Sequence, residues 1–444
     1  MKTLIQNAKV VNEGQIIEQD VYIREGRIEK IDKQIDLSAD ETIDASGLYL
    51  IPGMIDDQVH FREPGLTHKA EIKTESMAAV AGGITSFMEM PNTNPVTDSA
   101  SEIQKKLDLA SQKSHANYAF YLGATNNNLE NIKKIDPNLI CGLKVFMGSS
   151  TGNMLVDDPE VLSGIFKHSP VLIATHCEHT PSIEENEQLY LKKFGFNIPM
   201  HHHANIRSRE ACLKSSSLAV ELARKYQSKL HVLHITTEDE LLLFEKGQMD
   251  HKQITAEVCV HHLSFSEKDY HNLGSYIKCN PSIKKEEDRQ ALIRAVNEDS
   301  IDIIATDHAP HTMEEKQQSY FKAPSGIPLV QHALLKVLDF YHQGTFSLEK
   351  IVEKTSHNIA KRYEIKERGF IREGYWGDLV LLDLHRKEQI TQDSLLYKCQ
   401  WSPFLGHTFN SKIISTFVNG YKVFDQGKVH PSKKAKAIEF DRTS

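Results

Sequence analysis

The chain has 444 residues, a formal net charge of −8 and six cysteines, and 40% of its residues are hydrophobic. This length allows one large α/β domain with an accessory module, and a negative net charge argues against general nucleic-acid binding. No run approaches the roughly 18 apolar residues of a membrane span, and the cysteines lack CxxC spacing. We therefore expect a cytoplasmic protein with reduced thiols and no membrane partner.

Both ends of the chain carry patterns that are typical of short strands. Near the N-terminus, alternating apolar residues flank a turn at Glu25-Gly26, and near the C-terminus Asn419-Gly420 is the signature of a tight hairpin. Neither end holds enough strands for an independent core. We expect the two ends to build one small composite β-sandwich, made of residues 1–52 and 366–444.

Between the two ends, apolar strand candidates alternate with amphipathic helix candidates. The clearest helix runs from Lys69 to Ala81 and is ended by Gly82-Gly83. Eight such βα units in residues 53–365 predict an α/β fold, a (β/α)₈ barrel. The eight strands are expected at 53–59, 83–89, 117–123, 142–147, 171–175, 230–235, 254–259 and 302–306.

Several of these strands end in side chains that can bind a metal, and barrel enzymes place their catalytic groups at such strand ends. A single strand-end histidine is usually a hydrogen-bonded core residue, and a single lysine usually extends to solvent. Imidazoles, a carboxylate and a buried amine at the ends of one barrel instead indicate a site for a zinc-like divalent ion. These residues are His60, Lys144, His176, His234 and Asp307.

The first strand departs from the simplest metal-binding pattern. Alternate side chains of a strand share a face, so positions 56, 58 and 60 are expected to point the same way. Two imidazoles at such an i, i+2 spacing would clasp one metal, but this chain offers Gln58 and His60. An amide oxygen is a weak zinc ligand beside an imidazole.

Motifs along most of the chain resemble, in order, those of the dihydroorotases, which are cyclic amidohydrolases. That family has Asp-x-His-x-His at the end of its first barrel strand, and Gln58 stands where the first His belongs. The segments 377–380 and 402–406 resemble the family's closing sandwich. The other matching motifs are His60-Phe61-Arg62-Glu63-Pro64-Gly65, Met90-Pro91-Asn92-Thr93, Gly142-Leu143-Lys144, His176-Cys177-Glu178, His261-His262-Leu263, Asn280-Pro281 and Thr306-Asp307-His308-Ala309-Pro310-His311.

The resemblance implies a metal centre built around an N-carboxylated Lys144, whose carbamate would bridge two metals. His176 and His234 would hold one metal, and His60 and Asp307 the other. Because Gln58 replaces a histidine, we expect one tightly bound zinc on the histidine pair and a weaker or partly occupied zinc beside His60. Asp307 would also act as the catalytic group that moves the proton.

The resemblance also implies a substrate site. Arg62, Asn92 and His311 would bind the free carboxylate of the substrate, and Asn280 would line the pocket. A planar guanidinium matches a carboxylate, which hydantoins and plain dihydropyrimidines lack. The expected reaction is therefore the reversible hydrolysis of the small molecule dihydroorotate to N-carbamoyl-aspartate, a step of pyrimidine synthesis.

Two alternatives stay open. The first is another cyclic amidohydrolase, an allantoinase or an enzyme of the dihydropyrimidinase or hydantoinase type. The second is a non-catalytic dihydroorotase-like paralogue that serves as an assembly partner; Gln58 favours it, whereas the five candidate ligands argue against it. The sequence is also compatible with a homo-oligomer.

Overall fold

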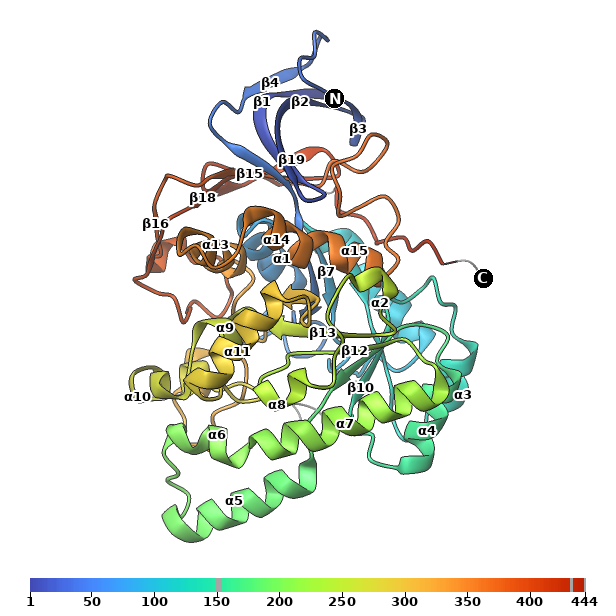
Figure 1. Ribbon diagram of the computed structural model, residues 1–444, viewed down its shortest axis with the longest axis vertical. Helices are drawn as coiled ribbons and strands as arrows, with labels where there is room; N and C mark the ends of the chain where they lie inside the picture. Colours follow the sequence, from blue (N-terminus) through green and yellow to red (C-terminus); the bar gives the residue numbers. More distant parts are fainter. Residues whose placement is uncertain (149–153, 432–433, 443–444) are drawn as a thin grey trace.

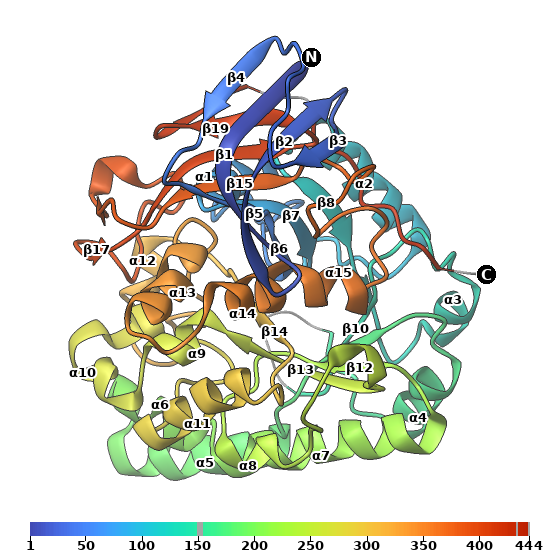
Figure 2. The same cartoon turned by 45° about the horizontal axis from the view of Figure 1, so that its top comes forward.

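The computed structural model describes residues 1–148, 154–431 and 434–442. Strands from the two ends of the chain lie together at the top of Figure 1, and a ring of strands surrounded by helices lies below them. Figure 2 shows the same division, with β5 leading from the upper sheet into β6 of the ring.

The upper layer is a nine-stranded sheet in which the C-terminal strands form one half and the N-terminal strands the other, and the two halves meet where β15 pairs with β5. Its order is β20-β19-β18-β15-β5-β1-β2-β3, and β4 pairs with β1. The predicted Asn419-Gly420 hairpin joins β18 to β19, with both residues at positive φ. The strands are β1 Lys2–Asn12, β2 Gln15–Arg24, β3 Arg27–Asp32, β4 Glu41–Asp44, β5 Tyr49–Pro52, β15 Leu379–Asp383, β18 Lys412–Val418, β19 Tyr421–Asp425 and β20 Lys428–Val429; β16 Glu388–Gln389 and β17 Thr408–Phe409 pair separately.

The lower layer is the predicted barrel. Its parallel strands fall into a three-stranded sheet, β6-β7-β8, and a six-stranded sheet, β9 to β14. Only Tyr121 separates β8 from β9, and a bridge between Val59 and His308 links β6 to the segment after β14. The strands are β6 Met54–Val59, β7 Ile84–Glu89, β8 Asn117–Phe120, β9 Leu122–Gly123, β10 Leu143–Phe146, β11 Ile173–His176, β12 Leu230–Val232, β13 Ile254–Cys259 and β14 Ile303–Ala305.

Helices follow the barrel strands and cover the ring. The helix predicted from Lys69 begins at Ile72, because Glu71 has an extended backbone and forms the N-terminal cap. The helices are α1 Ile72–Ala81, α2 Ala100–Lys113, α3 Leu129–Lys134, α4 Pro159–His168, α5 Thr180–Phe194, α6 His203–Ile206, α7 Arg209–Tyr226, α8 Glu238–Leu241, α9 Val260–Ser264, α10 Tyr270–Leu273, α11 Glu286–Asn297, α12 Met313–Lys316, α13 Ala333–His342, α14 Leu348–Val352 and α15 Asn358–Arg362.

The end of the chain returns to the barrel. Ala437 forms a bridge with Tyr118 of β8, and Arg442 donates to the carbonyl oxygens of Ile140 and Cys141. The domain boundaries at 52/53 and 365/366 stay a prediction. All six cysteines are buried and unpaired. Within the described part of the chain, no helix is both long and apolar enough to cross a membrane.

Candidate metal centre and active site

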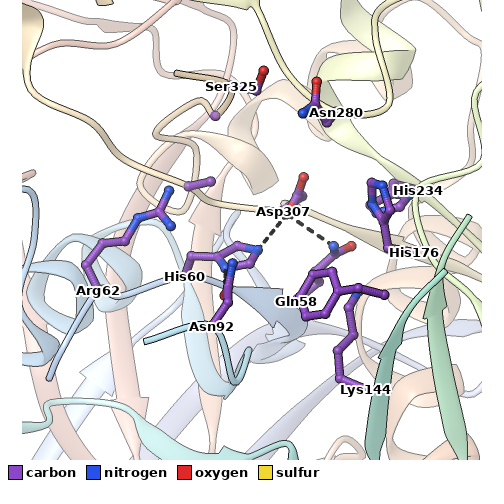
Figure 3. A pocket seen from close by; sticks show the side chains of 13 residues that line it. Gln58, His60, Arg62, Asn92, Lys144, His176, His234, Asn280, Asp307 and Ser325 are labelled. Atoms are coloured by element: carbon purple, nitrogen blue, oxygen red, sulfur yellow. Dashed lines mark hydrogen bonds and ion pairs between the residues drawn. The ribbon is translucent and has the colours of Figure 1, made fainter. Parts of the chain in front are cut away.

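A pocket lies where the barrel strands end, and it gathers nearly all the residues that the sequence pointed to (Figure 3). Of the predicted site residues, only His311 is not part of its lining. Strands β6, β7, β10, β11, β12 and β14 each supply a side chain from their last residues or the loop that follows. The lining residues are Gln58, His60, Arg62, Asn92, Lys144, Phe146, His176, His234, Asn280, Asp307, Ala309, Ser325 and Gly326.

His176, the last residue of β11, and His234, two residues after β12, face each other on one side of the pocket. His176 Nδ1 lies 3.0 Å from His234 Nε2. His176 Nε2 lies 3.0 Å from a carboxylate oxygen of Glu178, which is also paired with Arg207. The negative charge of this carboxylate favours a proton on Nε2, which leaves the lone pair of Nδ1 for a metal. Burial lowers the pKa of both histidines, which favours the neutral form that binds metals. This pair fits a divalent metal.

Lys144 is the second residue of β10 and stands next to this pair (Figure 3), and it is only 1% exposed. Within the described chain its amine has no hydrogen bond or ion pair, and it lies 4.8 Å from the centre of the Phe146 ring. Burial lowers its pKa to about 8, with opposing effects from Asp307 and Glu257. A neutral amine is the form that reacts with carbon dioxide to give a carbamate. The environment therefore suits the predicted modification.

Asp307 lies in the middle of the pocket, with His60 on the side away from the histidine pair and Gln58 toward Lys144 (Figure 3). Asp307 Oδ1 accepts a hydrogen bond from Gln58 Nε2 at 3.1 Å and lies 3.2 Å from His60 Nε2. His60 Nδ1 lies 2.7 Å from the side-chain oxygen of Asn92, to which it donates. A proton or a metal must therefore stand between His60 Nε2 and the carboxylate. Because Gln58 presents its donor end, this side fits a metal less well than the histidine pair does.

Asp307 is held as a carboxylate. Although burial opposes ionisation, the hydrogen bond and charge of His60 lower the pKa of Asp307. An ionised carboxylate in the pocket can accept a proton from a reacting water. Asp307, His234 and Arg62 all adopt positive φ, at 48°, 41° and 68°. Such a backbone costs about 1–3 kcal/mol per residue and is typical of functional sites, where the surrounding structure enforces it.

Arg62 defines a cationic corner of the pocket. Its side chain is buried, and its Nε donates to the carbonyl oxygen of Pro310 at 3.1 Å. A terminal nitrogen lies 3.0 Å from His311 Nε2, but that ring accepts from Lys69 at Nδ1 and so donates through Nε2 to Ser325 O. His311 therefore does not satisfy the guanidinium. No described carboxylate forms an ion pair with Arg62, which leaves this buried cation suited to an anionic ligand.

Three residues in or beside the pocket were not predicted from the sequence: Glu178, Ser325 and Gly326. Glu178 belongs to a recognised motif, but nothing in a single sequence indicates that it orients His176. Ser325 and Gly326 come from a loop without any motif, and only the fold brings them to the pocket. Asn280 was predicted, and its side-chain oxygen is buried without a hydrogen-bond partner among the described residues. That oxygen is available to a ligand.

The sequence profile of the amidohydrolase family matches residues 49–423, and the chain belongs to this family. It is 31% identical over 442 residues to a dihydroorotase of Bacillus cytotoxicus, covering 96% of this chain and 99% of the relative. It is 30% identical over 436 residues to a dihydroorotase of Bacillus cereus, covering 95% and 97% of the two chains.

The solved structures that superimpose on this chain are hydantoinases and dihydropyrimidinases rather than dihydroorotases. An L-hydantoinase (dihydropyrimidinase) from Arthrobacter aurescens superimposes with a TM-score of 0.93 at 25% identity, covering 98% of this chain and 99% of the other. A dihydropyrimidinase from Brevibacillus agri gives 0.90 at 23% identity over the full length of both chains, which shows the fold alone. The predicted cyclic amidohydrolase class and barrel fold are confirmed, and the protein is a hydrolase of that class.

Proposed function

We propose that the protein is a zinc-dependent dihydroorotase that interconverts dihydroorotate and N-carbamoyl-aspartate. One observation supports the choice of substrate. Arg62 is a buried cation that lines the same pocket as the candidate metal ligands, and no described carboxylate forms an ion pair with it. Of the candidate cyclic amides, dihydroorotate brings a carboxylate that a guanidinium can bind with two hydrogen bonds. The sequence relatives named dihydroorotase support the same choice.

The residues divide the work between binding and proton transfer. Arg62 would hold the substrate carboxylate, with the side chains of Asn92 and Asn280 beside it, and so would orient the ring amide toward Lys144 and the histidines. Asp307 would take a proton from the attacking water and deliver it to the leaving ring nitrogen. In the reverse direction Asp307 would take the proton from the nitrogen and return it to the departing water.

His176, His234 and carboxylated Lys144 would hold the tighter zinc, and His60 with Asp307 would hold the weaker one. When bound, zinc would activate the water and polarise the scissile carbonyl group. Glu178 would keep His176 in the correct tautomer, and the hydrogen bond from His60 to Asn92 would do the same for His60.

A hydantoinase or dihydropyrimidinase is the second candidate, and the close superposition on the Arthrobacter enzyme favours it. A panel of dihydroorotate, dihydrouracil and hydantoin, offered to the purified protein loaded with zinc, separates the candidates. We expect ring opening of dihydroorotate at least 100-fold more efficiently than of either uncharged ring. Preference for an uncharged ring would support the second candidate, and no turnover of any ring would support a non-catalytic paralogue.

A further inference from the structure

A second group of metal-type ligands lies inside the barrel, nearer the N-terminal ends of the strands than the pocket. Asp57 of β6, His231 of β12 and Glu257 of β13 are each 0% exposed. One potential ligand atom from each lies within 4.8 Å of the others. β6 and β12 are not neighbours in the barrel, so these side chains meet across its interior.

The geometry around His231 is that of a ligand. Its Nδ1 lies 2.8 Å from Thr255 Oγ1, and this hydroxyl donates to the carbonyl oxygen of Leu230. Nδ1 therefore carries a proton, and Nε2 faces the two carboxylates, where a second proton or a metal ion can stand. Although burial opposes the charge, the hydrogen bonds and charges of Asp57 and Glu257 raise the pKa of His231. Nε2 lies 3.4 Å from Asp57 Oδ2 and 3.4 Å from Glu257 Oε2. Good hydrogen bonds are about 2.7–3.2 Å long, whereas ligands about 2.1 Å from a tetrahedral ion stand roughly 3.4 Å apart.

His231 is the only described cationic partner of these two buried carboxylates, and one imidazolium can neutralise only one of them. Asp57 Oδ1 is buried and has no hydrogen bond within the described chain, and no described lysine or arginine pairs with Asp57 or Glu257. An unpaired buried carboxylate is costly. The other oxygen of Asp57 accepts from the hydroxyl of Tyr363 at 2.8 Å, which in turn contacts Tyr121 at 2.7 Å. Hydrogen bonds of this kind commonly orient the ligands of a metal.

We propose that Asp57, His231 and Glu257 bind a structural divalent transition-metal ion of the zinc class, distinct from the zinc of the pocket. Two carboxylates and a neutral imidazole balance the charge of such an ion, and Asp57 Oδ1 is free to supply a fourth ligand. The ion would also fix Glu257, whose Oε1 accepts from the backbone N–H of His234 at 3.3 Å. This buried site would thereby support the end of β12 that enters the pocket.

The direct test uses the natural protein crystallised after purification with zinc. Anomalous diffraction across the zinc absorption edge should show a peak between the three side chains, besides any peak in the pocket. Zinc in the pocket with no peak at Asp57, His231 and Glu257 would overturn the proposal. Because no substitution is involved, misfolding cannot obscure this result.

Metal analysis gives an independent test. Lys144→Ala should remove zinc from the pocket and keep one zinc per chain, and adding Asp57→Asn, which preserves shape but removes the charge, should remove that zinc as well. Equal zinc in the two variants would contradict the proposal. Because the three ligands are fully buried, EDTA should not strip this zinc from the native protein, whereas unfolding in urea should release it to a coloured chelator.

Discussion

Lys144 is the side chain on which the proposed chemistry depends most. A free ammonium beside metal cations would be repelled, whereas a carbamate supplies a bridging anion. We expect Lys144→Ala to lose the pocket zinc and at least 1,000-fold in activity, as an order-of-magnitude estimate, with partial rescue by acetate or propionate. The matched control is Lys105→Ala, an exposed lysine of α2 that pairs with Glu102. An unmodified amine in the density of an active, zinc-loaded enzyme would contradict the prediction.

Arg62 sets the substrate in this account. Removing a buried, charge-assisted contact should cost about 2–5 kcal/mol, and Arg62→Ala should therefore raise KM for dihydroorotate at least 30-fold. Arg62→Lys keeps the charge but loses the planar fork, so it should also impair binding. Slow turnover of an uncharged ring is the internal control. Because such a ring has no carboxylate for Arg62 to bind, Arg62→Ala should change its kinetics much less. Unaltered kinetics with dihydroorotate in Arg62→Ala would exclude the proposed substrate contact.

Gln58 decides how strongly the second zinc binds. Its amide donates to Asp307 Oδ1, the oxygen that also faces His60. Replacing this donor with an imidazole lone pair in Gln58→His should raise the zinc content of the pocket toward two ions per chain. Competition with a zinc chelator measures the change, and the zinc proposed at Asp57 is common to both proteins. Two equally tight pocket ions before and after the substitution would show that Gln58 does not weaken the site.

At the scale of elements, one hydroxyl ties the first barrel strand to the last. Thr306 Oγ1 donates to Asp56 at 2.6 Å, and it accepts from the backbone N–H of His308 at 2.9 Å. Thr306→Val leaves both partners buried and unsatisfied, so the free energy of unfolding should fall by about 1–3 kcal/mol. Thr306→Ser keeps the hydroxyl and is the matched control. Equal urea midpoints for the valine and serine variants would contradict this role.

The strands could be predicted because their apolar runs are local signals. All eight expected barrel positions hold strands, with the third split into β8 and β9 around Tyr121. The prediction that side chains alternate between the two faces of β6 was less accurate. Its pairing with β7 is irregular between Asp56 and Val59, so Asp57 as well as Gln58 reaches the barrel interior. A register irregularity leaves no mark in a single sequence, and the meeting of Asp57 with His231 could not be predicted.

The candidate site, too, could be predicted only in part from the sequence. Its candidate ligands could be chosen because each reactive side chain ends a predicted strand. The partners that orient them could not, because Glu178, Asn92 and Tyr363 act through contacts that depend on the closed fold. Local patterns thus predicted which groups meet in the pocket, whereas hydrogen bonding around those groups required the structure.

For the whole molecule, buried neutral histidines predict acid sensitivity. Burial lowers the pKa of His332 to about 3 and that of His261 to about 4, from 6.5. The unfolded chain therefore binds more protons below about pH 6.5, so the stability is complete above that pH and is lost as the pH falls toward the folded values. Each of these two histidines should lower the free energy of unfolding by about 2 kcal/mol between pH 6.5 and pH 5.

Urea unfolding at several pH values measures this loss. The free energy of unfolding should fall by more than 2 kcal/mol from pH 7 to pH 5, and His332→Gln should flatten the slope because it removes one titrating group. A free energy of unfolding that stays constant or rises over this range would show that the buried histidines do not govern acid stability.

The central claim is that a Lys144 carbamate and Arg62 together select and position dihydroorotate. A crystal structure of the zinc-loaded protein with dihydroorotate or N-carbamoyl-aspartate bound tests it most directly. We expect a carboxylated Lys144 and the ligand's carboxylate within hydrogen-bonding distance of the Arg62 guanidinium, with the ring amide or ureido group facing Asp307. A bare lysine amine, or a ligand carboxylate directed away from Arg62, would contradict the account.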